Sequence, residues 1–183
     1  NAASTDDILI TSTGTVDSLD AGNGTNNIDV EGTVTNDVEG GNNVDTITVA
    51  DGADVGGDIR GLDDADVFFL NGVVGGEVSG GDGADTYTVG TTATGELVIN
   101  DGTNSATGNF EDTINPITNT VLNSFTANDV GTITIGSELA PTGAVDISAG
   151  EFNFIGLGTD SILRAGANLT IDAGVMNWDG QIQ

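Results

Sequence analysis

The sequence predicts an all-β fold, a right-handed parallel β-solenoid (β-roll or β-helix), with coils of about 20 residues followed by coils of about 24 residues. Three observations predict it. A pattern rich in Gly and Asp recurs at nearly constant spacing, short runs of alternating apolar and polar residues follow its copies, and the 29 glycines interrupt every window of helical length. Because one repeat cannot bury an apolar face by itself, successive copies are expected to stack as coils.

One copy of the repeat is complete. Residues 80–88 read GGDGADTYT, which fits the nonapeptide G-G-x-G-x-D-x-U-x, where U is a large apolar residue, at every fixed position. Less regular copies occupy residues 40–48, 61–69 and 21–28, and a trace remains at 6–8. Such a regular period places the sixth position of every copy in one column along the turns. The sixth position falls at Asp6, Asn26, Asp45, Asp66 and Asp85, with steps of 20, 19, 21 and 19 residues.

Short strands are predicted on both sides of each coil. The first strand follows the Gly/Asp turn, and a looser second strand completes the coil, so the sequence predicts two strands and two turns per coil. The predicted first strands are residues 28–30, 46–49, 67–70 and 86–89, and the predicted second strands are 34–38, 55–59, 73–78 and 97–99. Alternation along the first strands predicts one internal stack made of Ile28/Val30, Ile47/Val49, Phe68/Leu70 and Tyr87/Val89.

A longer repeat occupies the C-terminal part of the chain. An offset of 24 residues aligns Ile147 with Ile171 and Asn153 with Asn177, which indicates a wider β-helix with about three strands per coil. The two asparagines form either a stacked amide ladder or two separate surface side chains. The chain thus divides into three parts. These are a β-roll-like solenoid with Gly/Asp-rich turns (1–100), an irregular enlarged coil with a bulging loop at about 101–109 (101–136), and wider repeats that we expect to continue or pair beyond the end (137–183).

The composition excludes several classes of function. The chain has 29 acidic and 2 basic residues and a net charge of −27, which disfavours binding to nucleic acid or to anionic lipid. It has no Cys, and no apolar run approaches the roughly 18 residues of a membrane span. The chain has no His or Lys, which are common general bases and acids in enzymes. Its carboxylates recur in every coil, as structural groups do, so we expect no enzyme.

The column of acidic turn residues raises the question of a cation. Carboxylates stacked about 5 Å apart repel each other, and calcium, which takes six to eight oxygen ligands, would turn that repulsion into attraction. The alternative is a solvated Gly/Asp/Asn-rich turn column without metal. The candidate metal ligands are Asp45, Asp66 and Asp85 in the column, Asn26 at its weak end, and the nearby Asp63, Asp64 and Asp82.

Over residues 20–90 the chain resembles the hemolysin-type (RTX) calcium-binding β-roll, on the strength of the nonapeptide copies quoted above. The resemblance implies calcium held between successive turns by the sixth-position Asp and by turn carbonyl groups. The family repeats its nonapeptide on both sides of the roll, whereas the opposite turns here, at 51–54, 71–74 and 91–94, lack the pattern. Calcium is therefore expected in one turn column only.

Residues 169–174, LTIDAG, resemble repeats of filamentous-haemagglutinin and autotransporter passenger β-helices, which implies a surface stalk or adhesin. Together these features predict a structural or adhesive segment of a bacterial-type secreted or cell-surface protein: a surface-layer, stalk, matrix-fibre or adhesin module rigidified by calcium. Its expected partners are other copies of itself, end to end or laterally, or cell-surface polysaccharide. Phe69, which alternation sends outward beside Val67, is a candidate for a lateral contact between rods.

Two other functions stay open at this point. One is a β-solenoid that assembles into filaments without metal, in which the acidity serves solubility. The other is a carbohydrate-binding or carbohydrate-active β-helix, for which Phe152, Phe154 and Trp178 are candidate groove aromatics if they face outward. Outward T-x-T triplets also suggest an ice-binding face, but Val67 and Phe69 interrupt the ladder, and ordinary β-propensity explains Thr in strands.

Overall fold

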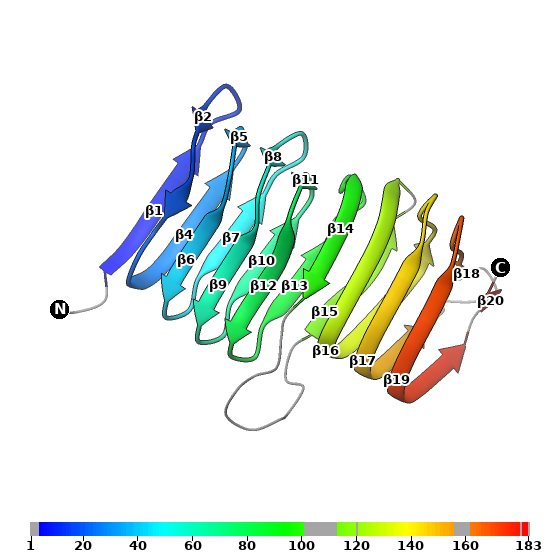
Figure 1. Ribbon diagram of the computed structural model, residues 1–183. Coiled ribbons are helices and arrows are strands. Elements are labelled where there is room, and N and C mark those ends of the chain that lie inside the picture. Colours follow the sequence, from blue (N-terminus) through cyan, green and yellow to red (C-terminus); the bar gives the residue numbers. More distant parts are fainter. Residues whose placement is uncertain (1–3, 101–112, 120, 156–161, 180, 183) are drawn as a thin grey trace.

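The computed structural model describes residues 4–100, 113–119, 121–155, 162–179 and 181–182. Within these ranges every regular element is a strand, and all strand pairs are parallel, so the chain forms a parallel β-solenoid as predicted (Figure 1). No helix in the described ranges has the length and apolar character that a membrane crossing requires. The bulging loop predicted at about 101–109 lies outside the described residues.

Three faces build the N-terminal coils. The first face stacks one strand from each coil in sequence order: β1 (Ser4–Ile10), β4 (Gly24–Val30), β7 (Thr46–Val49), β10 (Val67–Leu70), β13 (Thr86–Val89) and β15 (Thr113–Asn119). The second face stacks β3 (Leu19–Asp20), β6 (Val38–Asn42), β9 (Ile59–Asp63), β12 (Glu77–Asp82) and β14 (Gly95–Asn100). A short third face stacks β2 (Thr15–Val16), β5 (Thr33–Val34), β8 (Asp54–Val55) and β11 (Val73–Val74).

The expectation of two strands per coil is wrong for three coils, because the predicted second strands 34–38, 55–59 and 73–78 are each split into two, whereas 97–99 lies within the single strand β14. The break falls at Asn36-Asp37 in one coil and at the pairs Gly56-Gly57 and Gly75-Gly76 in the next two. Gly pairs and Asn-Asp are residues that favour turns, so the chain bends there and separates the third face from the second.

The C-terminal coils use longer strands. These are β16 (Leu122–Leu139), β17 (Val145–Ile155), β18 (Ile162–Leu163), β19 (Leu169–Asp179) and β20 (Gln181–Ile182). β16 pairs with β14 through its first half and with β15 through its second half, so one strand bends from the second face to the first (Figure 1). The three strands expected per wide coil are thus replaced by one long bent strand and one short strand.

The internal stack is confirmed. All eight residues predicted to face inward from the first strands lie in the core, with side chains that are 0–5 % exposed. The rings of Phe68 and Tyr87 stack in parallel, with centroids 4.8 Å apart and an angle of 9° between the ring planes. The Tyr87 hydroxyl accepts a hydrogen bond from the Gly80 main-chain N–H at 2.6 Å, so its polar atom is satisfied inside the apolar core.

The 24-residue register of the C-terminal part is also confirmed. β17 and β19 pair Ile147 with Ile171 and Asn153 with Asn177. Nδ2 of Asn177 donates to Oδ1 of Asn153 at 2.8 Å and to Oε1 of Glu151 at 2.9 Å. The amide ladder therefore forms, on the outward side of two strands. Of the candidate groove aromatics, Phe152 is buried in the core and so cannot line an outer groove. The side chains of Phe154 and Trp178 lie outside the described part of the structure.

Candidate functional site

The turn column lies at the corner where the second face passes to the first. Asn26, Asp45, Asp66 and Asp85 stand one above another at this corner, each directly before or at the start of a first-face strand. All four side chains point into the solenoid and are 0–2 % exposed. Asp6 pairs with Asn26 at the head of the column but is exposed. The spacing of the repeat thus predicted one column, and the structure buries most of it.

One oxygen of each buried carboxyl group is bonded to the main chain of the preceding coil. The N–H of Asn26 donates to Oδ1 of Asp45 at 2.6 Å, and the N–H of Asp45 donates to Oδ1 of Asp66 at 2.6 Å. The N–H of Asp66 donates to Oδ1 of Asp85 at 2.7 Å. Each coil therefore supplies the hydrogen-bond acceptor that the coil before it needs.

Asn26 shows what surrounds the inner terminal atom of a column side chain, which is Nδ2 in Asn26 and Oδ2 in the aspartates. Its Nδ2 donates to the carbonyl oxygens of Gly40 at 3.1 Å, Gly24 at 3.2 Å and Gly22 at 3.4 Å. The inner end of this column position is therefore lined by hydrogen-bond acceptors. A side chain that places an oxygen there needs either a proton on that oxygen or a cation beside it.

The aspartates place an oxygen at that position. Oδ2 of Asp45 and Oδ2 of Asp66 are buried, and no hydrogen-bond donor of the described residues reaches either atom. Oδ2 of Asp66 and the carbonyl oxygen of Gly80 both lie beside the α-carbon of Gly61, where a Cβ would overlap the carboxyl group. The first Gly of each nonapeptide thus makes room for the carboxyl group of its own turn, which explains the spacing between Gly61 and Asp66.

Burial changes the acidity of the column. Loss of solvation raises the pKa of Asp66 to about 8, against the lowering effect of the Asp45 N–H bond and with further help from the charges of Asp85, Asp45 and Asp64. Burial also raises the pKa of Asp45, although hydrogen bonds from Asn26 oppose the shift. At neutral pH and without a cation, Asp66 therefore carries a proton.

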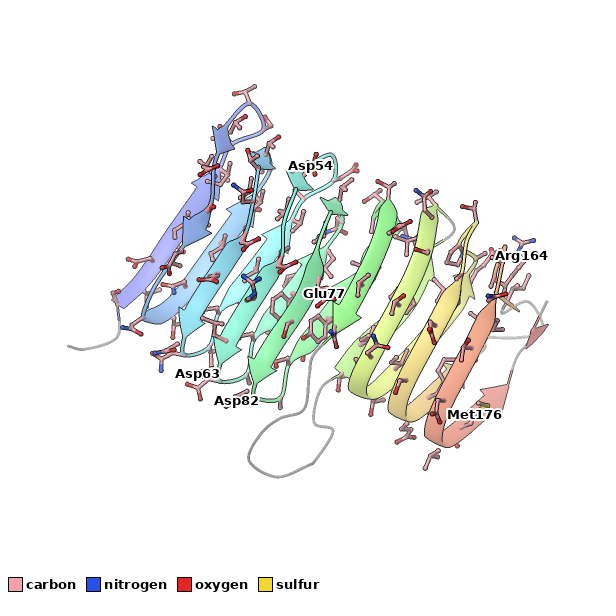
Figure 2. The ribbon with its side chains drawn as sticks, in the orientation of Figure 1. Asp54, Asp63, Glu77, Asp82, Arg164 and Met176 are labelled. Carbon is pink, nitrogen blue, oxygen red and sulfur yellow. The ribbon has the colours of Figure 1, made fainter. Side chains whose placement is uncertain are left out.

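The other three candidate ligands lie on the outer side of the same turns. Asp63, Asp64 and Asp82 are exposed and line an open depression together with Asn42 and Asn43. Figure 2 labels Asp63 and Asp82 at this edge of the solenoid and Asp54 at the opposite edge. The seven predicted ligands therefore separate into a buried row of four and an exposed row of three.

In the described ranges, no group of three or more His, Cys, Asp or Glu side chains is arranged to hold a metal ion by itself. An ion in the column would therefore depend on main-chain oxygens as well as carboxylates. The available donors are oxygen atoms only: the second carboxylate oxygens of Asp45 and Asp66, and turn carbonyls such as that of Gly80. This donor chemistry suits a hard cation such as calcium.

The turn conformation is the same in complete and in degraded copies of the repeat. The second position has φ of 120° at Gly41, 98° at Leu62 and 100° at Gly81. The fourth position also has positive φ in all three copies, at Asn43, Asp64 and Gly83. Leu62 therefore holds a backbone conformation that favours glycine, and its side chain is 38 % exposed, so it gains little burial in return.

We expect Leu62→Gly to stabilise the protein by about 0.5–1 kcal/mol, because it removes left-handed strain of about 1–2 kcal/mol and adds a smaller entropic cost in the unfolded chain. Urea unfolding measures the change. Leu62→Ala serves as the control, because alanine keeps the Cβ and therefore the strain. Equal stability of the two variants would contradict this explanation.

Sequence reasoning missed a second column at the corner between the third and second faces. The N–H of Asp58 donates to Oδ1 of Asp37 at 2.9 Å, and the N–H of Glu77 donates to Oδ1 of Asp58 at 2.9 Å. Arg60 reaches Asp37 at 3.1 Å, Glu39 at 3.2 Å and also Asp58. The Asp58 N–H and Arg60 together lower the pKa of Asp37. The sequence signal that could have predicted this column was the 21-residue spacing of Asp37 and Asp58, with an arginine two residues after Asp58.

The two columns differ in how their charge is balanced. The second column is part-exposed and has Arg60 beside it, whereas no arginine or lysine contacts the described part of the first. Comparison of the chain with family models, with curated proteins and with solved structures finds no match. The function is therefore inferred from the turn column and from the charge of the molecule.

Proposed function

We propose that this chain is a structural segment of an extracellular protein, a rigid β-solenoid rod whose buried acidic column is stabilised by calcium. One observation carries the proposal: Oδ2 of Asp45 and Oδ2 of Asp66 lie buried without a hydrogen-bond donor, at positions where Asn26 places a donor. A hard cation meets this requirement where calcium is abundant, which is outside the cell.

The residues of the chain prepare such a site in two ways. The bonds to Oδ1 hold each carboxyl group in one orientation, with Oδ2 turned toward the first glycine of its repeat. The glycines of the turn leave the adjacent carbonyl oxygens accessible. Calcium, when bound, would supply positive charge between successive coils. Because the unfolded chain does not hold these oxygens together, binding would stabilise the folded rod by about 2.7 kcal/mol at a calcium concentration 100 times the dissociation constant.

A structural role also agrees with the rest of the molecule. Carboxylates that recur in every coil have the regularity of a scaffold, whereas an active site needs a singular arrangement. The net charge of −27 favours solubility of the rod. An adhesive or surface-layer use of the rod is part of the same proposal and rests on the resemblance of residues 169–174 to autotransporter repeats.

The experiment is a calcium titration of metal-stripped protein at pH 8.5 and at pH 5.5, followed by calorimetry. We expect calcium to raise the melting temperature at pH 8.5 and to have less effect at pH 5.5, because a proton occupies Asp66 at the lower pH. Asp66→Asn should blunt the response. It should also stabilise the calcium-free protein at pH 8.5, because an amide at this position can donate as Asn26 does.

Asp51→Asn is the matched control, because Asp51 is exposed at the opposite turn, where the repeat pattern is missing. This variant should respond to calcium as the unmodified protein does. If calcium does not change the melting temperature of metal-stripped protein at pH 8.5, the proposal that the column binds calcium would be wrong. The column would then be a ladder of protonated carboxyl groups, and the rod a metal-independent solenoid, an alternative that the raised pKa of Asp66 favours.

A further inference from the structure

Over five successive coils, the described side chains on the outward side of the first face are uncharged. The strands concerned are β7, β10, β13, β15 and residues 132–134 of β16. Their described outward side chains alternate with core residues and include no acidic or basic group, in a chain with a net charge of −27. Charge returns at both ends, with Asp29 in register with Thr48 and Glu151 in register with Thr132. We call this surface the neutral face. It consists of Thr46, Thr48, Val67, Phe69, Thr86, Thr88, Thr113, Thr132 and Thr134.

An apolar pair lies within the neutral face. Phe69 is 39 % exposed, and Val67 stands beside it on the same strand, β10. β10 lies between β7 and β13 (Figure 1), and these two strands carry threonine pairs in register with Val67 and Phe69. An exposed aromatic with a rim of uncharged polar residues and no charge at its core is the anatomy of a protein–protein interface.

We propose that a second copy of this chain docks on the neutral face, in a two-fold arrangement that places Phe69 of one copy against the neutral face of the other. The net charge of the chain is the reason to expect a second copy on the neutral face. Two copies that carry −27 each repel one another wherever their acidic surfaces meet, and the neutral face is where they approach without opposing carboxylates. A two-fold contact uses the same patch on both copies, so a face that suits one copy suits its partner.

The size of the face predicts a weak contact. Five coils at about 4.8 Å and two outward residues per strand give a patch of about 25 by 10 Å, which is well below the roughly 800 Å² per partner of a stable dimer. The association should therefore depend on protein concentration and strengthen with salt, because salt screens the repulsion between the remaining acidic surfaces. It goes beyond the structural role proposed above and does not require calcium.

Sedimentation velocity in EDTA, over a range of protein concentrations at 0.05 and 0.5 M NaCl, tests the proposal. We expect a monomer–dimer equilibrium that tightens at the higher salt. Phe69→Thr repeats the residue of both neighbouring strands and so preserves the fold, and it should weaken the dimer about tenfold, the loss expected for a central aromatic. Phe69→Asp should abolish dimerisation. Val121→Asp, which adds the same charge at another exposed apolar residue away from the neutral face, should leave it unchanged.

Monomers at every concentration in 0.5 M NaCl would overturn the proposal, as would a dimer that Phe69→Thr does not weaken. Retention of the monomeric chain on insoluble cellulose or chitin, lost in Phe69→Thr, would assign the neutral face to a neutral polysaccharide instead. Because all these measurements are made without calcium, failure of the dimer and failure of the calcium proposal are separate results.

Discussion

Gly41→Ala should destabilise the protein by about 3 kcal/mol or more, a loss in the range of severe backbone substitutions. Gly41 has a φ of 120°, which an L-residue rarely adopts, and a Cβ built on it would overlap the carbonyl oxygen of Gly22 in the preceding coil. The main chain fixes the position of the added Cβ, and the atom it overlaps is a main-chain oxygen, so no side-chain rotation relieves the overlap. The coils would have to separate locally, and the hydrogen-bond ladder that holds them about 4.8 Å apart resists that movement.

Gly52→Ala separates the two causes. Gly52 has a φ of 81°, but its added Cβ would have nothing within 4 Å, so this variant carries only the conformational penalty of about 1 kcal/mol. Urea unfolding of both variants, followed by far-UV circular dichroism, gives the comparison. Similar losses in the two variants would show that close stacking of coils at Gly41 is unimportant.

The stability of calcium-free protein should fall as the pH rises from about 4 to about 8. The pKa of Asp66 is raised to about 8 in the folded protein, whereas a carboxyl group in the unfolded chain titrates near 3.9. The folded state therefore binds this proton more tightly. The resulting stabilisation is complete below the unfolded pKa and is lost as the pH rises through the folded pKa. The slope is about 1.4 kcal/mol per pH unit for one proton between these limits.

Urea unfolding in EDTA at pH 5, 6, 7, 8 and 9 measures this dependence. Asp66→Asn should flatten the slope, and the raised pKa of Asp45 acts in the same direction as that of Asp66. A flat profile in the unmodified protein would mean that the column is hydrated rather than buried.

The repeat spacing was sufficient to predict the strands of the first face and their register. A slip of one residue would turn Ile47 outward and Thr48 inward, so the alternation of apolar residues leaves one pairing that buries them. The same spacing placed Asp45, Asp66 and Asp85 in one column. Each of them lies two residues before an inward core residue (Ile47, Phe68 or Tyr87) and shares its direction. Because each also comes just before a predicted strand, in a turn where alternation cannot be assumed, the sequence did not predict their burial.

Other features depend on contacts that a repeat pattern does not contain. Buried Asn119 donates to the carbonyl oxygens of Gly90 and Ala93 and accepts from the N–H groups of Val121 and Leu122, and it joins the narrow coils to the first wide coil. In the sequence it is one asparagine in a stretch rich in Asn and Thr. The second column was not predicted for a similar reason, because the three acidic partners of Arg60 come from two different coils.

The linkage of each coil to its successor constrains how the gene can change. The amide of Asn26 is satisfied by Asp45 of the next coil, and the carboxyl group of Asp37 accepts from the amide of Asp58 in the next coil. Loss or duplication of DNA that encodes one coil between Asp45 and Asp85 would rejoin the first column in register, because successive aspartates there present equivalent carboxyl and N–H groups. An insertion of one or two codons within a strand does not. The rod can therefore lengthen or shorten during evolution in units of one coil, with little effect on the coils that remain.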